Sequence, residues 1–281
     1  MKAAGTVRRM LRSAAIVLAA GGLLTGAVPP SAENGYHAGS PEDAGDVPAH
    51  LRIARSLVAD IRPENNRYVH GRMVVWGDGP ISGPVTAFTD CSGFVGSVLK
   101  RAGTPAYSLL DRDAAALSGY VRYPLARDYY HAIVAARGFQ PVDAPPPAIR
   151  PGDIIAVLFS SRAARDAEAD TGHLMIVDQT PVPRNATPPF VDGTRQWSVV
   201  VLDSSGGHGP ADSRNRSGMA ASGGVGRGIL RLYSDAAGRI AGYAWSLSPG
   251  APFRPASQAP LAVGRLPPVP PASASSPSSN G

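Results

Sequence analysis

A single cysteine, Cys91, stands at the start of a stretch whose pattern predicts a short helix over residues 91–103. Asp90 is a favourable N-cap residue, because its carboxylate can accept a hydrogen bond from a backbone N–H of the first turn. A cysteine in the first turn meets the partial positive charge of the helix N-terminus, which favours the nucleophilic thiolate. Cys91 is therefore a candidate nucleophile, and a small buried apolar side chain is the alternative.

A cysteine hydrolase also needs a base near the sulfur and a third group that orients this base. Of the six histidines, His173 is the best candidate, because it directly follows Gly172 and begins an apolar run typical of a strand. Asp203 ends another predicted strand, and opposite residues of antiparallel strands lie about 5 Å apart. We expect Asp203 to accept a hydrogen bond from His173 and so fix its tautomer.

A structural, non-catalytic role is the alternative for each of these residues. His173 can be a half-buried strand residue, and Asp203 a strand-end or turn former. Cys91, His173 and Asp203 can also act together as three zinc ligands with one open position. Among the other histidines, His131 is expected to pack on a helix, and His208 to be solvated in a Gly/Ser-rich segment.

The elements that must position these residues fall into two groups along the chain. Apolar periodicity predicts helices first and strands afterwards, which indicates an α+β domain with a mostly antiparallel sheet of about five strands. Two long loops, 180–193 and 204–227, separate some of the strands. The predicted helices are 47–61, 91–103, 112–117 and 125–136, and the predicted strands are 154–159, 172–178, 196–203, 228–233 and 240–246.

The ends of the chain differ in composition from its centre. Residues 1–32 combine a basic start with an apolar run and small residues, as a secretory signal peptide does, with an uncleaved anchor as the alternative. Residues 33–46 read as a flexible leader, 47–248 as the folded domain, and 249–281 as a disordered Pro/Ser/Ala-rich tail. Removing the signal lowers the net charge from +6 to +2, which gives little support for nucleic-acid binding.

Four short segments resemble motifs that follow one another in the same order in a known family of enzymes. They are Tyr-Val-His-Gly at 68–71, Asp-Cys-Ser-Gly-Phe-Val at 90–95, Pro-Gly-Asp-Ile-Ile at 151–155 and Gly-His-Leu-Met-Ile-Val at 172–177. Together they resemble the NlpC-type bacterial cell-wall cysteine peptidases. The resemblance covers about residues 48–247 and implies a papain-like fold, with the helix of the cysteine packed on the sheet.

The resemblance also implies roles for single residues. It makes Cys91 the nucleophile, His173 the base and Asp203 the third polar residue, where the family usually has His, Asn or Gln. It gives Asp90 and Ser92 the task of holding a free amine of the peptide substrate.

The upstream segment carries one further role and two departures from the family pattern. Tyr68 is expected to lie at the site and to help polarise the carbonyl. His70 stands where the family has tryptophan, and Arg72 where it has glycine, so substrate choice can differ from the family norm.

The implied function is that of an exported hydrolase of peptidoglycan stem peptides, cutting the bond between D-glutamate and diaminopimelate through an acyl-enzyme. We expect it to be secreted or periplasmic and associated with the cell wall. It should need no cofactor or metal, bind no nucleic acid and have no stable membrane span after processing. The alternative is an inactive papain-like module that binds the cell wall or a protein partner.

Overall fold

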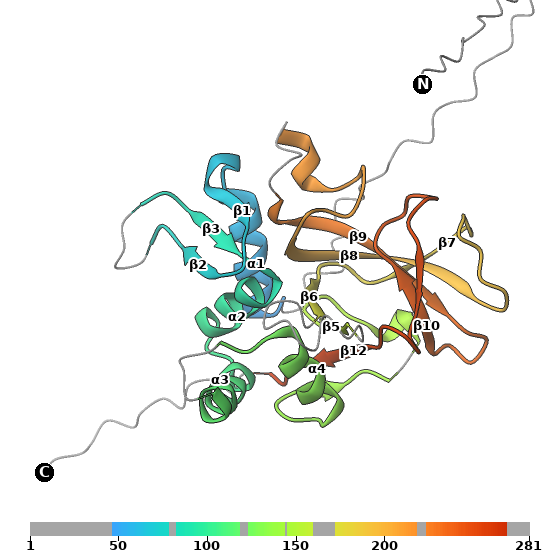
Figure 1. Cartoon of the computed structure of the whole chain (residues 1–281), viewed down its shortest axis with the longest axis horizontal. Coiled ribbons are helices and arrows are strands. Elements are labelled where there is room, and N and C mark those ends of the chain that lie inside the picture. The colour runs from blue at the N-terminus through green and yellow to red at the C-terminus, as the bar shows by residue number, and fades with distance from the viewer. Residues whose placement is uncertain are drawn as a thin grey trace, which may run out of the picture. The chain divides into compact units, whose positions relative to one another are not determined.

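The computed structural model describes residues 47–78, 83–118, 123–143, 145–159, 172–217 and 223–268, all within one unit that spans Asp43–Gly281. In these ranges the chain forms four α-helices, a three-stranded sheet and a nine-stranded antiparallel sheet (Figure 1). The α+β class is as predicted, but the large sheet has nine strands rather than about five. The predicted signal peptide, residues 1–32, and leader, 33–46, lie outside the described residues.

The helices are α1 (Ala49–Asp60), α2 (Cys91–Arg101), α3 (Pro105–Ser118) and α4 (Ala126–Val134). Helices were predicted at all four places, and α1, α2 and α4 begin within two residues of the expected position. Helix α3 begins seven residues earlier than predicted. Its first residue is Pro105, which suits a first helical turn because its ring fixes φ and the missing N–H has no partner there anyway.

The large sheet has the order β11-β10-β9-β8-β6-β5-β12-β4, and β7 pairs with β8 beside this path. Its strands are β4 (Gln140–Pro141), β5 (Ile154–Leu158), β6 (Gly172–Val177), β7 (Val182–Arg184), β8 (Arg195–Ser205), β9 (Gly224–Ser234), β10 (Ile240–Ala244), β11 (Phe253–Pro255) and β12 (Leu261–Arg265). The small sheet has β3 (Thr86–Thr89) between β1 (Asn66–Tyr68) and β2 (Arg72–Val75). Three short 3₁₀ helices, η2 (Pro63–Asn65), η3 (Pro146–Ala148) and η4 (Ser213–Ser217), complete the described elements.

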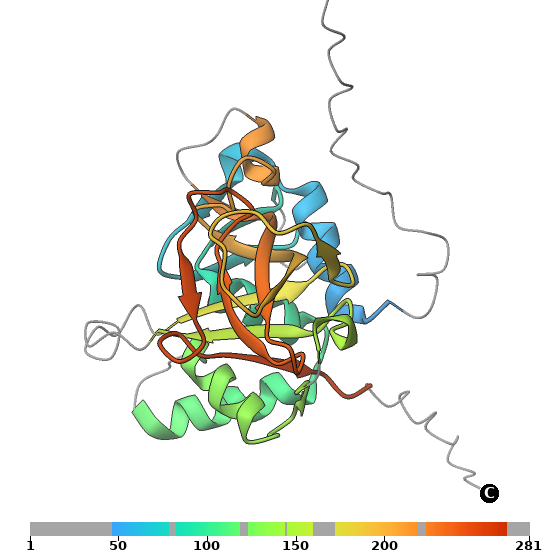
Figure 2. The same cartoon turned by 90° about the vertical axis from the view of Figure 1, so that its right-hand side faces the viewer.

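The C-terminal segment corrects the predicted domain boundary at residue 248. Strand β12 pairs with β5 on one side and β4 on the other, so it lies inside the sheet (Figure 2). Arg265 at its end also donates to both carboxylate oxygens of Asp153, at 2.9 and 2.8 Å. A short run with only two buried residues, Val263 and Gly264, is thus held by backbone pairing on both edges, which composition does not reveal. The predicted tail beyond residue 268 lies outside the described residues.

The two predicted loops also contain regular structure. The 180–193 segment includes β7, and the 204–227 segment includes the end of β8, the 3₁₀ helix η4 and the start of β9. Strand β9 begins in a Gly-rich sequence with little strand propensity, yet it pairs with β8 from Gly224 to Ser234 without a break. Tertiary pairing therefore overrides local propensity here.

Two apolar cores lie on the two faces of the large sheet. Along β5, Ile154 and Ala156 join the core formed with the helices, whereas Ile155 and Val157 join a second core with β8, β9 and β10. Successive side chains of a strand point to opposite faces, so a strand covered on both faces must be apolar throughout. This explains the unbroken apolar runs of β5 and β6.

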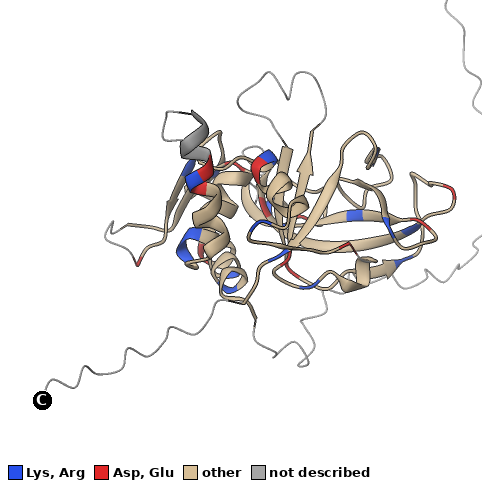
Figure 3. Ribbon diagram, turned by 90° about the horizontal axis from the view of Figure 1, so that it is seen from below, with Lys and Arg blue, Asp and Glu red and all other residues tan. Residues whose placement is uncertain are grey.

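Charged residues of both signs are interspersed along the helices and strands (Figure 3). In the part of the chain that the structure describes, no helix is both long and apolar enough to cross a membrane.

Candidate active site

Helix α2 presents Cys91 as its first residue, as predicted. The Oδ1 atom of Asp90 accepts a hydrogen bond from the backbone N–H of Gly93 at 2.7 Å, so Asp90 is the N-cap. The Cys91 sulfur lies 4.0 Å from the carbonyl oxygen of Gly172, the residue before His173. The residue is only 5% exposed, so the sulfur lies in a covered position between α2 and the start of β6.

His173 meets Asp203 as the sequence predicted. The Nε2 atom of the imidazole lies 2.7 Å from the Oδ2 atom of Asp203, and both residues are buried. The two are not directly opposite, because β6 and β8 pair Ile176 with Leu202 and then separate. Continuing that register places Asp203 opposite Met175, so His173 reaches it along the diagonal, a distance that a long side chain can bridge.

The other side of the His173 ring faces the cysteine. Burial opposes the charged imidazolium, but attraction to the Cys91 sulfur and hydrogen bonds to Asp203 and Cys91 together raise the pKa of His173 to about 10. Since Nε2 is engaged by Asp203, Nδ1 is the nitrogen left for the sulfur. An imidazolium beside a cysteine sulfur is the arrangement that activates cysteine nucleophiles.

Asp203 is also the centre of a buried ionic cluster that the sequence did not reveal. His208 was expected to be solvated, but it is 2% exposed, and its Nε2 atom lies 2.8 Å from the Oδ2 atom of Asp203. Its Nδ1 atom lies 2.8 Å from the carbonyl oxygen of Trp245. Both partners can only accept, so both nitrogens of His208 must carry hydrogen for both bonds to form. The geometry therefore favours His208 as a cation.

Arg214 and Asp212 complete this cluster. The Nη2 atom of Arg214 lies 2.9 Å from the Oδ1 atom of Asp203 and 2.7 Å from the Oδ2 atom of Asp212. Asp212 also accepts from the backbone N–H groups of His208 and Arg214, both at 2.8 Å. We call Asp203, His208, Asp212 and Arg214 the Asp203 cluster; its two carboxylates balance its two cations.

The cluster keeps Asp203 ionised. Burial alone would raise the pKa of this carboxyl, but the charges of His208 and Arg214, with hydrogen bonds from His173 and His208, hold it well below its usual range. An ionised Asp203 can steady the His173 imidazolium and fix its orientation.

A glycine pattern in β9 makes room for the cluster. Gly226 and Gly228 are two residues apart and so lie on one face of the strand. A Cβ atom at Gly226 would lie under 3.0 Å from the Arg214 side chain, and one at Gly228 under 3.0 Å from His208. The alternating glycines at 224, 226 and 228 were therefore a sequence signal that side chains from elsewhere cross this strand.

The Trp245 ring packs against the imidazoles of both His173 and His208. It stacks on His208, with centroids 5.0 Å apart, and meets the His173 ring edge-on at 4.7 Å. Trp245 was not among the predicted site residues, because it lies in the fifth predicted strand, far along the chain from Cys91.

The predicted substrate-binding residues also lie near Cys91. Tyr68 pairs with Thr89, two residues before the cysteine, and its ring lies edge-on to His70 at 5.9 Å. Asp90 accepts hydrogen bonds from the Ser92 and Tyr123 hydroxyls, both at 2.9 Å, besides its capping bond. Asp90 is thus engaged within the protein, and an amine-binding role for Asp90 and Ser92 stays a prediction. Tyr123 was not identified from the sequence.

The zinc alternative finds no ligand set here. Among the described residues, no group of three or more His, Cys, Asp or Glu side chains has an arrangement that could hold a metal ion.

Comparison with known proteins gives one relative of note. No family model matches the chain, and no solved structure matches it. The chain is 32% identical over 233 residues to an uncharacterized protein of Acanthamoeba polyphaga mimivirus. The aligned region covers 78% of this chain and 96% of that protein. The chain therefore belongs to the same family as this mimivirus protein.

Proposed function

We propose that this protein is an exported cysteine peptidase with a papain-like fold that hydrolyses peptidoglycan stem peptides, at the bond between D-glutamate and diaminopimelate. One observation carries the proposal. The His173 imidazole lies between the Cys91 sulfur and a buried, ionised Asp203. The sequence resemblance supplies the substrate, and the predicted signal peptide supplies the location, secreted or periplasmic and associated with the cell wall.

In the proposed reaction, the Cys91 sulfur attacks the carbonyl carbon and forms a C–S bond. The backbone N–H of Cys91, at the N-terminus of α2, donates to the resulting oxyanion. His173 then gives the proton on Nδ1 to the leaving amine as the C–N bond breaks. Water, deprotonated by His173, attacks the thioester and releases the acid and the free thiol. Asp203 stays ionised and keeps His173 oriented throughout.

The test is turnover of purified muropeptides, with products identified by mass spectrometry. Wild type should release a new amine at diaminopimelate, and Cys91→Ala should be inactive although it still folds and unfolds cooperatively on heating. Ser56→Ala, on the exposed side of α1, serves as a control and should keep full activity. Uncut muropeptides, or equal activity in Cys91→Ala, would contradict the proposal.

One observation favours the second candidate, an inactive module that binds the wall or a partner. Cys91 and His173 are each 5% exposed, so little of the catalytic pair reaches the surface. Alkylation of Cys91 by iodoacetamide across pH separates the two. Fast alkylation at neutral pH, with a midpoint well below the usual thiol value of about 8.5, supports the enzyme. Alkylation that only begins above that value supports the inactive module.

A further inference from the structure

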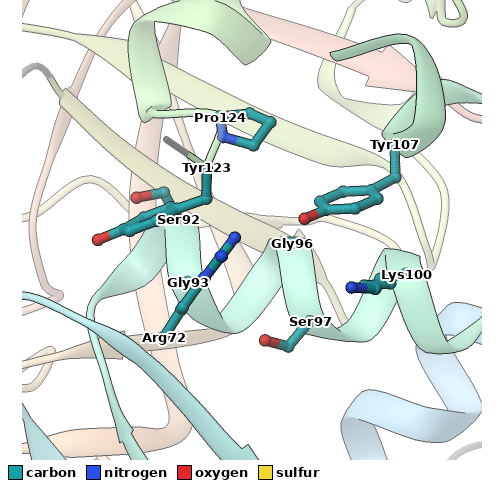
Figure 4. A pocket seen from close by; sticks show the side chains of 9 residues that line it. All are labelled: Arg72, Ser92, Gly93, Gly96, Ser97, Lys100, Tyr107, Tyr123 and Pro124. Atoms are coloured by element: carbon teal, nitrogen blue, oxygen red, sulfur yellow. The ribbon is translucent and has the colours of Figure 1, made fainter. Parts of the chain in front are cut away.

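A cavity of about 190 Å³ lies along α2, from Ser92 to Lys100 (Figure 4). Helix α2 forms one wall with small residues, and β2, α3 and the segment before α4 supply the others. The residues that matter here are Arg72, Ser92, Gly96, Lys100, Tyr107 and Tyr123.

One end of the cavity lies at the residue that follows the proposed nucleophile. Ser92, which follows Cys91 in the chain, lines this end. At this end the Tyr123 hydroxyl donates to Asp90 at 2.9 Å. A group bound at this end of the cavity would therefore lie beside the residue that follows the proposed nucleophile.

The charges that line the cavity are positive and lack an acidic partner. Arg72 and Lys100 make no ion pair with any residue that the structure describes, whereas Arg101, next along α2, pairs with Asp78 at 2.6 Å. The Arg72 guanidinium lies over the Tyr123 ring, 5.2 Å from its centroid, which orients it at the cavity.

The acids nearest the cavity are already engaged by phenols. Tyr123 donates to Asp90, and Tyr107 donates to Asp111 at 3.4 Å. These two carboxylates accept hydrogen bonds from phenols that line the cavity, and neither forms an ion pair with Arg72 or Lys100.

We propose that this cavity binds a carboxylate of the substrate, held by Arg72 and Lys100 close to the scissile carbonyl. The inference rests on the proposed peptidase function and refines it. It also replaces the expected ligand beside Ser92, because a free amine would be repelled by the two cations. A glutamate that is linked through its side chain keeps its α-carboxylate free, which is the group this cavity suits.

The first test uses two peptides that differ in one group. Both contain D-glutamate joined through its side chain to diaminopimelate, with either a free α-carboxylate or an α-carboxamide. Wild type should cut the carboxylate form with a KM about tenfold lower. Arg72→Gln and Lys100→Gln should abolish this preference by raising the KM of the carboxylate form alone, with kcat unchanged. Arg52→Gln, an exposed cation on α1, is the matched control and should keep the preference.

The second test needs no turnover, because the chain has a single cysteine. Iodoacetate is anionic and iodoacetamide neutral, so their rates of alkylating Cys91 report the local field. The iodoacetate/iodoacetamide rate ratio should fall about threefold or more in Arg72→Gln and Lys100→Gln, and not in Arg52→Gln. Addition of 1 M salt should reduce the wild-type ratio, since screening then acts within about 3 Å.

The two tests separate two kinds of failure. If neither peptide is cut but the alkylation ratio falls in both variants, the anion site stands and the peptidase proposal is lost. If peptides are cut without preference and the ratio is the same in Arg72→Gln, Lys100→Gln and wild type, the anion site is wrong. Tighter binding of the carboxamide form would also overturn it.

Discussion

The two sides of Cys91 use charge in opposite ways. On the His173 side, the Asp203 cluster is buried, and every charge in it has an oppositely charged neighbour within 3 Å. On the cavity side, Arg72 and Lys100 are exposed and have no acidic partner among the described residues. Desolvated, balanced charges fix geometry, because moving any one of them leaves another unpaired. Exposed charges without an acidic partner do not fix the positions of other side chains, so they can bind a ligand. The comparison predicts that substitutions on the two sides fail in different ways.

The largest effect is expected from Asp203→Asn. The amide would present N–H groups to His173, His208 or Arg214, all of which donate, and would leave two buried cations without their shared carboxylate. We expect unfolding in urea to show a loss of about 3–5 kcal/mol, together with a large fall in kcat. Asp192→Asn, which removes an exposed carboxylate outside the cluster, should leave both unchanged. An Asp203→Asn protein of wild-type stability would contradict the account of the cluster.

A smaller loss is expected from filling the space above β9. In Gly228→Ala the new methyl group would overlap the His208 ring, so the ring must shift away from Asp203. We expect a loss of stability of about 1–3 kcal/mol, as for other overpacked sites. Gly206→Ala is the control, because a Cβ there meets no atom within 4 Å. Equal stability of the two variants would show that His208 is not held against β9.

The pH dependence of His173 tests the catalytic side of this comparison. The pKa of His173 is raised to about 10, so its contribution to stability is fully present below its unfolded value of about 6.5 and is lost as pH rises through about 10. Cys91→Ala removes the largest of the causes that raise this pKa. NMR titration should therefore show the His173 midpoint falling toward lower pH in Cys91→Ala. An unchanged midpoint would mean that the sulfur and the imidazole do not interact.

The smallest effect on stability is expected on the cavity side. Arg72→Gln should change the free energy of unfolding by less than about 0.5 kcal/mol, because Arg72 is exposed and has no acidic partner among the described residues. The same urea experiment that reports on Asp203→Asn measures this. A loss as large as that of Asp203→Asn would show that Arg72 is structural and would remove the contrast between the two sides.

The residues that sequence analysis identified share a local signal. Cys91 follows an N-cap and begins an amphipathic helix, and His173 begins an apolar strand, so each position could be predicted from its neighbours. The bond from His173 to Asp203 required only that their strands be adjacent. His208 and Arg214 gave no such signal, because their segment has no apolar period and is ordered by ion pairs with Asp203 and Asp212.

The fold, like the site, could be predicted only where the sequence has a local pattern. The helices and the five central strands have apolar patterns, whereas β7, β11 and β12 are short and polar in part. These three strands form because their backbones pair with strands that have an apolar pattern of their own. The alternating glycines of β9 were visible in the sequence. Their role could not be predicted, because it depends on which side chains from elsewhere in the chain cross them.

The place of β12 has a consequence for how the protein is made. The partner that covers one edge of β5 is synthesised about a hundred residues after β5 itself. Until the chain has grown past residue 265, this apolar strand has one bare edge, and a bare edge invites pairing with other chains. The sheet is therefore complete only after residue 265 has been synthesised, and removing β12 should cause aggregation rather than give a shorter, active protein.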